Sequence, residues 1–161
     1  MAEQLGTQTI TSPSDRQKSV PVVTVESFYN SHAEKLQMKL EGPRVGFHRK
    51  IREPTINRPG LALSGFYTYF AEKRVQVLGA AEHSYLKSLP SKLRVKRFRK
   101  LCERKIPCLV MSRGFRLAPE LLGVTAEAKI AVSLSSHPST PSTLEPKGPV
   151  TARLVRCDRH V

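Results

Sequence analysis

The segment Ile106-Pro107-Cys108-Leu109-Val110-Met111 decides the fold, because it is an almost continuous apolar run. Such a run is typical of a strand covered on both faces, as in a largely parallel sheet. Cys108 lies inside it, so we expect a buried and inert thiol at this position. The sequence on either side of this strand can be interpreted from that starting point.

Helical and strand patterns alternate around the central segment. Ser91 to Glu103 predicts an amphipathic helix, and Pro119 to Glu127 predicts a second one with proline in its first turn. Arg74 to Gly79 alternates like a strand that a glycine closes, and Ala80 to Leu89 predicts the helix that follows. The apolar side of the first helix is formed by Val95, Phe98, Leu101 and Cys102.

The remaining elements are shorter. A β-branched strand is expected at Val22 to Val25, with Thr24 capping a helix that starts near Glu26. Pro59-Gly60 predicts a turn followed by a strand or a helical turn, and Lys129 to Val132 is the last strand candidate. Strands that alternate with helices indicate an α/β fold with a largely parallel sheet and flanking helices.

Three regions of different composition divide the chain. Residues 1–21 are rich in Ser, Thr and Gln without periodicity, so we expect a disordered leader. Residues 22–132 form the predicted domain. Residues 133–161 begin with a Ser-, Pro- and Thr-rich stretch and end in a basic one, so we expect a disordered tail.

Composition excludes several classes of protein. Apolar residues make up 39%, which suits a globular domain. No apolar run approaches the roughly 18 residues that a membrane helix needs, and the polar N-terminus has no signal-peptide core. We therefore expect a cytoplasmic protein without a membrane partner. The three cysteines lack the pairing of a zinc site, so no metal is expected.

The net charge of +14 is the most unusual bulk property. It is compatible with a nucleic-acid or acidic-partner surface, and also with a basic fragment of a larger, balanced protein. The segment Lys92 to Lys105 is the best nucleic-acid candidate. Aromatic residues for base stacking are scarce, with no Trp, so a solvated helix face is the favoured interpretation.

Four blocks in sequence resemble the N-terminal part of the HPr kinase/phosphorylases. Asn57-Arg58-Pro59-Gly60-Leu61-Ala62-Leu63-Ser64-Gly65-Phe66 is similar to an RPG signature early in that family. Arg74-Val75-Gln76-Val77-Leu78-Gly79-Ala80-Ala81-Glu82 is similar to the following block, Ile106 to Val110 with Arg113-Gly114 to a later strand, and Pro119 to Leu122 to the next helix. The resemblance covers roughly Val22 to Val132.

The resemblance implies more than the residues themselves show. Members of that family join an N-terminal α/β domain, similar to the first domain of some Mur ligases, to a C-terminal P-loop kinase domain. They assemble as hexamers. They phosphorylate a serine of the phosphocarrier HPr with ATP or pyrophosphate and magnesium, and they also remove that phosphate. This activity links the phosphotransferase system to carbon catabolite control.

The sequence departs from the family plan at the catalytic step. A P-loop requires Gly-x-x-x-x-Gly-Lys-Ser/Thr, because the lysine meets the phosphates and the hydroxyl holds magnesium. Gly60 and Gly65 have this spacing, but Phe66-Tyr67 follow them. We predict that the chain is inactive alone and has no cofactor of its own. A shift or truncation of the reading frame near Ser133 is the hypothesis for the tail.

The candidate binding residues come from the family blocks. Arg58 and Arg74, with backbone N–H groups near Gly60, form a candidate anion site. The alternative is that both arginines pair locally and fix turns, and that Glu82 caps a helix or pairs with one of them. Glu82-His83 as an acid–base pair has little specificity. No residue is assigned to catalysis.

Three functions remain open from the sequence. The leading one is a regulatory or assembly domain of an HPr serine kinase/phosphorylase, with HPr and other copies of the protein as partners. The second is a basic nucleic-acid-binding module. The third is a stand-alone sensor of a small ligand, which ligand-induced stabilisation would reveal.

Overall fold

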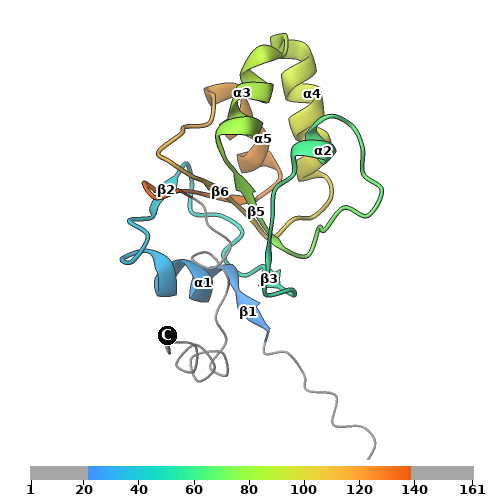
Figure 1. The fold of residues 1–161 in the computed structure, drawn as a ribbon. Helices are drawn as coiled ribbons and strands as arrows, with labels where there is room; N and C mark the ends of the chain where they lie inside the picture. Colours follow the sequence, from blue (N-terminus) through green and yellow to red (C-terminus); the bar gives the residue numbers. More distant parts are fainter. Residues whose placement is uncertain (1–21, 139–161) are drawn as a thin grey trace, which may run out of the picture.

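A computed structural model describes residues 22–138 of the chain. The predicted disordered leader, residues 1–21, lies outside the described residues, as does most of the predicted tail, residues 139–161. The disorder of both segments therefore stays a prediction. The described part is a mixed α/β structure built on a five-stranded sheet (Figure 1).

The sheet has the strand order β2-β7-β6-β5-β4. Its strands are β2 (Lys39–Glu41), β4 (Ile56–Asn57), β5 (Val75–Leu78), β6 (Cys108–Met111) and β7 (Ala131–Leu134). The pairs from β4 to β7 are parallel, and only the edge strand β2 pairs in the antiparallel sense. A largely parallel sheet is thus confirmed.

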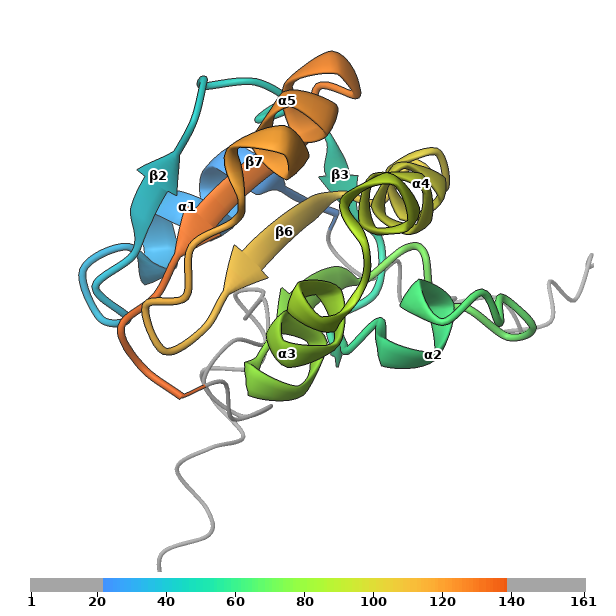
Figure 2. The same ribbon diagram turned by 90° about the horizontal axis from the view of Figure 1, so that it is seen from above.

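Helices cover one face of this sheet, and a smaller layer covers the other (Figures 1 and 2). The helical face consists of α2 (Gly60–Leu63), α3 (Ala80–Ser88), α4 (Ser91–Cys102) and α5 (Pro119–Glu127). The other face carries α1 (Val25–His32) and a two-stranded antiparallel sheet of β1 (Val23–Thr24) and β3 (Lys50–Ile51).

The central strands divide their side chains between two cores. Leu109 and Met111 of β6 join the core beneath the helices, whereas Cys108 and Val110 join the core beneath α1. All four residues of β6 are buried, as are all four of β5. The prediction that this apolar run forms a strand covered on both faces is therefore confirmed.

Local signals set the helix boundaries. The Thr24 hydroxyl oxygen accepts a hydrogen bond from the backbone N–H of Ser27 at 3.2 Å, so the predicted cap of α1 is confirmed. Pro119 occupies the first turn of α5, where its missing N–H costs nothing. Helix α4 buries Phe98, Leu101 and Cys102, three members of the predicted apolar side.

The sequence pattern did not define the element after Pro59 or the end of the last strand. The chain after Pro59 forms the short helix α2, which settles the choice between a strand and a helical turn. Strand β7 extends to Leu134, two residues beyond the predicted domain end at residue 132. The extension is stabilised because Ser135 donates its backbone N–H to Met111 O at 2.8 Å and its hydroxyl to Leu36 O at 2.9 Å.

Helix length bears on membrane insertion. Among residues 22–138, no helix combines the length and the apolar character that crossing a bilayer requires.

Candidate functional site

The carboxyl ends of the parallel strands meet at one edge of the sheet. Strand β4 leads into Arg58-Pro59-Gly60, β5 into Gly79, and β6 into Ser112-Arg113-Gly114. Open α/β sheets bind ligands preferentially at this edge. The candidate residues Arg58, Gly60 and Glu82 therefore lie at or next to this edge.

Glu82 lies at the junction of β4, β5 and α3. Its side chain is buried, and its Oε2 accepts a hydrogen bond from the backbone N–H of Gly79 at 2.8 Å. A Cβ atom added to Gly60 would lie 3.5 Å from Glu82 Oε1, and one added to Gly79 would lie 2.8 Å from Arg58 Nη1. Three predicted site residues, Arg58, Gly60 and Glu82, thus come together, and Glu82 caps α3 as predicted.

Arg74 lies elsewhere. Its Nε is 2.5 Å from Glu53 Oε2, and this ion pair lies at the amino ends of β4 and β5, away from the carboxyl edge. The predicted pairing of this arginine with a local carboxylate is therefore observed, and the structure does not bring it to Arg58. Gln76 of the same block is fully buried, and its Nε2 donates to the carbonyls of Ala71 and Arg74 at 2.9 Å.

A pocket of about 320 Å³ adjoins this junction between α3, α4 and the segment that joins β6 to α5. We call it the α3 pocket. Its apolar lining consists of Leu86, Met111, Leu117, Ala118 and Leu121, and its polar lining of His83, Lys87, Arg94 and Arg116. An apolar floor with a few convergent polar groups is the usual composition of a small-molecule site.

Two cations of the α3 pocket are available to a ligand. Among residues 22–138, the side chains of Lys87 and Arg116 have no hydrogen-bond or ion-pair partner. The His83 ring stacks on Phe115, with ring centroids 4.6 Å apart and planes 15° apart, which fixes one wall. The pocket therefore offers positive charge beside an apolar surface.

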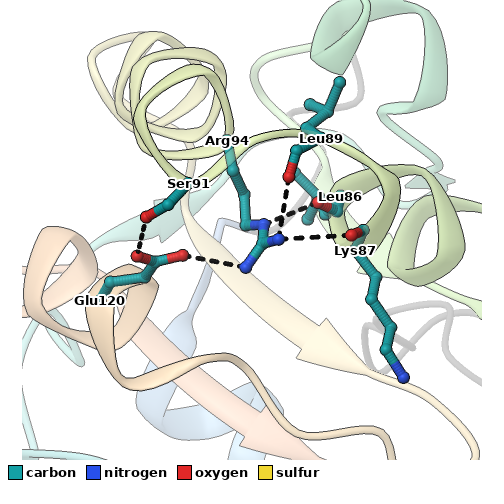
Figure 3. Close-up of polar contacts among 6 residues, drawn as sticks. All are labelled: Leu86, Lys87, Leu89, Ser91, Arg94 and Glu120. Carbon is teal, nitrogen blue, oxygen red and sulfur yellow. Dashed lines mark hydrogen bonds and ion pairs between the residues drawn. The ribbon is translucent and has the colours of Figure 1, made fainter.

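Arg94 holds the α3 pocket together rather than serving a ligand (Figure 3). Its Nε donates to Leu86 O at 2.7 Å and its Nη2 to Leu89 O at 2.9 Å, which satisfies carbonyls at the end of α3. Its Nη1 pairs with Glu120 Oε1 of α5 at 3.0 Å. One guanidinium thus ties α4 to α3 and α5, while the Lys87 side chain extends away from it (Figure 3).

The other arginines of α4 are also engaged. Arg97 donates to Ser64 O, Arg99 pairs with Glu127 at 2.9 Å, and Arg104 beyond the helix end lies 4.4 Å over the Tyr67 ring. Several basic side chains of the segment Lys92 to Lys105, the nucleic-acid candidate, are therefore engaged in contacts within the protein. Nucleic-acid binding itself stays a prediction.

The residues do not fit a magnesium–nucleotide site. The segment that begins at Gly60 forms the helix α2, and Phe66 and Tyr67 stand where a P-loop has lysine and a hydroxyl residue. Within the described range 22–138, no group of three His, Cys, Asp or Glu side chains is arranged to hold a metal ion. We assign no phosphoryl-transfer step to these residues.

The two described cysteines are structural. Cys102 and Cys108 are buried free thiols, and burial raises the pKa of each to about 12. Neither is a nucleophile near neutral pH, because the thiolate is the reactive form. The expectation of a buried, inert Cys108 is confirmed.

The α3 pocket is the feature that sequence reasoning missed. Its cations, Lys87 and Arg116, stand alone between helical and loop residues and form no motif. The nearest signal was Arg113-Gly114, which marks the start of the β6–α5 segment. Only the packing of α3 against that segment brings the two cations to one pocket.

The fold and the α3 pocket define a three-layer α/β domain with a candidate ligand site. The family described as HPr Serine kinase N terminus matches residues 23–145. Since the match covers more than half of the chain, the protein belongs to this family. The match continues thirteen residues past the predicted domain end at 132.

Several curated relatives carry the name HPr kinase/phosphorylase. The protein from Halalkalibacterium halodurans is 36% identical over 111 residues, which cover 69% of this chain and 36% of that protein. The one from Clostridium acetobutylicum is 49% identical over 78 residues, covering 48% of this chain and 26% of that protein. The chain thus matches between about a quarter and just over a third of the length of these relatives.

A similar fold occurs in a solved structure of another protein. It is the regulatory region, with CBS and DRTGG domains, of Clostridium perfringens pyrophosphatase, at a TM-score of 0.52 and 11% identity. The match covers 84% of this chain and 61% of that one. At this identity the likeness shows the fold alone, and the expected likeness to Mur ligases stays a prediction.

Proposed function

We propose that this chain is a regulatory and assembly domain of an HPr serine kinase/phosphorylase, and that it binds a small phosphorylated ligand in the α3 pocket. The catalytic steps, phosphorylation and phosphorolysis of HPr with ATP or pyrophosphate and magnesium, would belong to the part of the relatives that this chain does not span. Under the same proposal, the partners of the chain are HPr and further copies of the protein, and its location is the cytoplasm.

The observation that carries the proposal is the α3 pocket itself. It lies beside the carboxyl ends of the parallel strands, where α/β folds bind ligands, and its 320 Å³ lies within the range of small-molecule sites. Arg116 and Lys87 provide charge for a phosphate, and the floor of Leu86, Met111 and Leu121 can contact an apolar face. A ligand with one anionic end and a compact body with an apolar face, such as a base or the C–H face of a sugar ring, matches both.

The structural neighbour supports a sensory role for this fold. That regulatory region was solved with CBS and DRTGG domains together with an activator, diadenosine tetraphosphate. A fold that serves in the regulation of one enzyme is a reasonable basis for regulation in another. A pocket of about 320 Å³ is smaller than such a dinucleotide would need, so we propose a mononucleotide or a sugar phosphate here.

A thermal-shift titration tests the proposal. AMP and glucose 6-phosphate are added to the wild-type chain, to Arg116→Ala, and to Lys92→Ala as a control that removes the same charge from an exposed position on α4. We expect one of the ligands to raise the melting temperature of the wild type and of Lys92→Ala, because preferential binding stabilises the folded state. An equal rise in Arg116→Ala, or no rise in any of the proteins, contradicts the pocket assignment.

The catalytic half of the proposal has its own assay. The folded chain is incubated with HPr, magnesium and ATP or pyrophosphate, beside a full-length family member. We expect no phosphoserine with the chain alone. Phosphorylation of HPr by the chain would show that a phosphate-transfer site had been overlooked.

A further inference from the structure

A second concentration of positive charge lies at the opposite edge of the sheet. It is a depression of about 860 Å³ formed by residues that precede β5 and β6, together with β3 and its flanks. We call it the basic depression. Its cationic lining consists of Arg49, Lys50, Arg52, Lys73, Arg104 and Lys105, and its acidic lining only of Glu72 and Glu103.

Most of these cations are not neutralised by the protein. The arginines that form ion pairs with Glu26, Glu53, Glu120 and Glu127 are Arg44, Arg74, Arg94 and Arg99, and none of them lines the basic depression. In the same part of the chain, the side chains of Lys50, Arg52, Lys73 and Lys105 have no hydrogen-bond or ion-pair partner. The two glutamates in the lining therefore leave most of the charge unpaired.

The backbone holds these like charges near one another. The backbone N–H of Arg52 donates to Lys73 O at 3.3 Å, which places the two basic residues on adjacent segments. The ion pair between Glu53 and Arg74 secures the same two segments one residue further on. Like charges fixed on neighbouring segments repel, so the arrangement costs stability unless an anion fills it.

Arg49 and Lys105 belong to another part of the lining, in which Arg49 is held by hydrogen bonds and Lys105 has a strained backbone. Arg49 donates to Ile106 O at 2.9 Å and to Ala128 O at 2.7 Å, which anchors the floor. Lys105 has φ +57°, a left-handed conformation that glycine normally occupies after a helix. A lysine at this position gives up local stability, and it supplies a cation to the basic depression.

We propose that the basic depression binds a chain of linked phosphate groups, as in tripolyphosphate or the phosphate tail of a nucleoside triphosphate. Several separated cations around one open depression match several linked phosphates better than a single phosphate, which would meet only part of the charge. The lining has no Phe, Tyr or Trp, and its one aromatic ring, that of His48, is fewer than the successive rings on which single-stranded sites stack bases. This favours the phosphate chain itself over single-stranded nucleic acid.

Titration calorimetry of the whole chain tests this proposal, with sodium tripolyphosphate, orthophosphate and a single-stranded oligonucleotide as probes. The test variant combines Lys73→Gln with Lys105→Gly, and the control combines Lys92→Gln with Lys96→Gln, which removes two exposed charges from α4. We expect tripolyphosphate to bind the wild type and the control alike, and the test variant about tenfold or more weakly. Added salt should weaken binding to the wild type more steeply than binding to the test variant.

The thermal stability of the ligand-free proteins provides the second readout. Because Lys105→Gly relieves a strained φ and Lys73→Gln removes repulsion, the test variant should melt at or above the wild-type temperature. Loss of binding then reflects the charges and not misfolding. A test variant that binds tripolyphosphate as tightly as the wild type overturns the proposal.

Two other outcomes also contradict it. If orthophosphate binds as tightly as tripolyphosphate, no linked chain is recognised. If the oligonucleotide binds through Lys73 and Lys105 and tripolyphosphate does not displace it, the basic depression is a nucleic-acid surface. The inference is independent of the proposed function, since Arg116→Ala in the α3 pocket should leave tripolyphosphate binding unchanged.

Discussion

Arg94 shows how one charged residue can organise several elements. Its side chain is 23% exposed, yet it donates to three carbonyls at the end of α3 and pairs with Glu120, whose side chain is 32% exposed. A planar guanidinium has enough donors to meet all of these acceptors at once. The arginine thus stabilises the end of α3, which forms a wall of the α3 pocket.

Replacing this residue should be costly. Arg94→Met keeps the length of the side chain but removes the guanidinium that donates to the α3 carbonyls and pairs with Glu120, which then keeps only its hydrogen bond from Ser91, so we expect a loss of about 2–4 kcal/mol in unfolding free energy. Urea denaturation measures it. The matched control is Arg99→Met, which breaks a pair whose side chains are 48% and 67% exposed, and should leave stability essentially unchanged. Equal losses in both variants would contradict the anchoring role of Arg94.

The buried thiol of Cys108 predicts a pH dependence. Its pKa is about 12 in the folded chain, above the 9.0 of an ordinary thiol, because burial disfavours the thiolate. The unfolded state therefore releases this proton first as the pH rises. The contribution of Cys108 is fully present below about pH 9 and is lost between about pH 9 and 12.

Unfolding free energies of the wild type and Cys108→Ser measure this contribution. We compare their slopes between about pH 8 and 10.5, and the wild type should lose up to about 1.4 kcal/mol per pH unit more than the variant above pH 9. Other titrating groups are common to both proteins and cancel. Parallel slopes would mean that Cys108 ionises in the folded protein as readily as in the unfolded one.

At the scale of elements, two of the glycines with positive φ differ in their surroundings, because only one of them is also closely packed against other backbone atoms. Gly46, at φ +72°, lies before β3, and an added Cβ would overlap the carbonyl oxygen of Lys129. Gly114, at φ +69° after β6, has nothing within 4 Å of an added Cβ. The first position requires glycine for two reasons and the second for one.

Alanine substitutions should reveal this difference. Gly114→Ala carries only the conformational penalty, about 1 kcal/mol, whereas Gly46→Ala adds a clash with fixed backbone and should cost about 3 kcal/mol or more. Chemical denaturation of the two variants gives the comparison directly. If Gly46→Ala were the milder change, the segment before β3 would not be packed against the turn at Lys129.

The elements that could be predicted were those with complete local signals. The apolar run of β6, the proline at the start of α5 and the Thr24 cap each carry their structure in a few adjacent residues. The end of β7 could not be predicted, because Ser133 and Ser135 are polar and gain their place through distant partners such as Leu36. The family blocks located Arg58, Gly60 and Glu82, but no local pattern indicated the α3 pocket or the basic depression.

For the whole molecule, the two edges of one sheet have different charge and shape. The carboxyl edge carries the α3 pocket, with an apolar floor and two available cations. The amino edge carries the basic depression, which is larger and lined by six Lys and Arg side chains. Part of the chain's net charge of +14 is therefore concentrated at two places on the described domain, in keeping with anion binding.

The α3 pocket is the central claim, and a nuclear magnetic resonance titration with AMP tests it most directly. Backbone amide signals of the folded chain are followed as AMP is added. We predict saturable shifts centred on His83, Lys87 and Arg116, with the residues of the basic depression unaffected or affected only at higher concentration. Shifts confined to other regions, or no saturable shift at all, would contradict ligand binding in the α3 pocket.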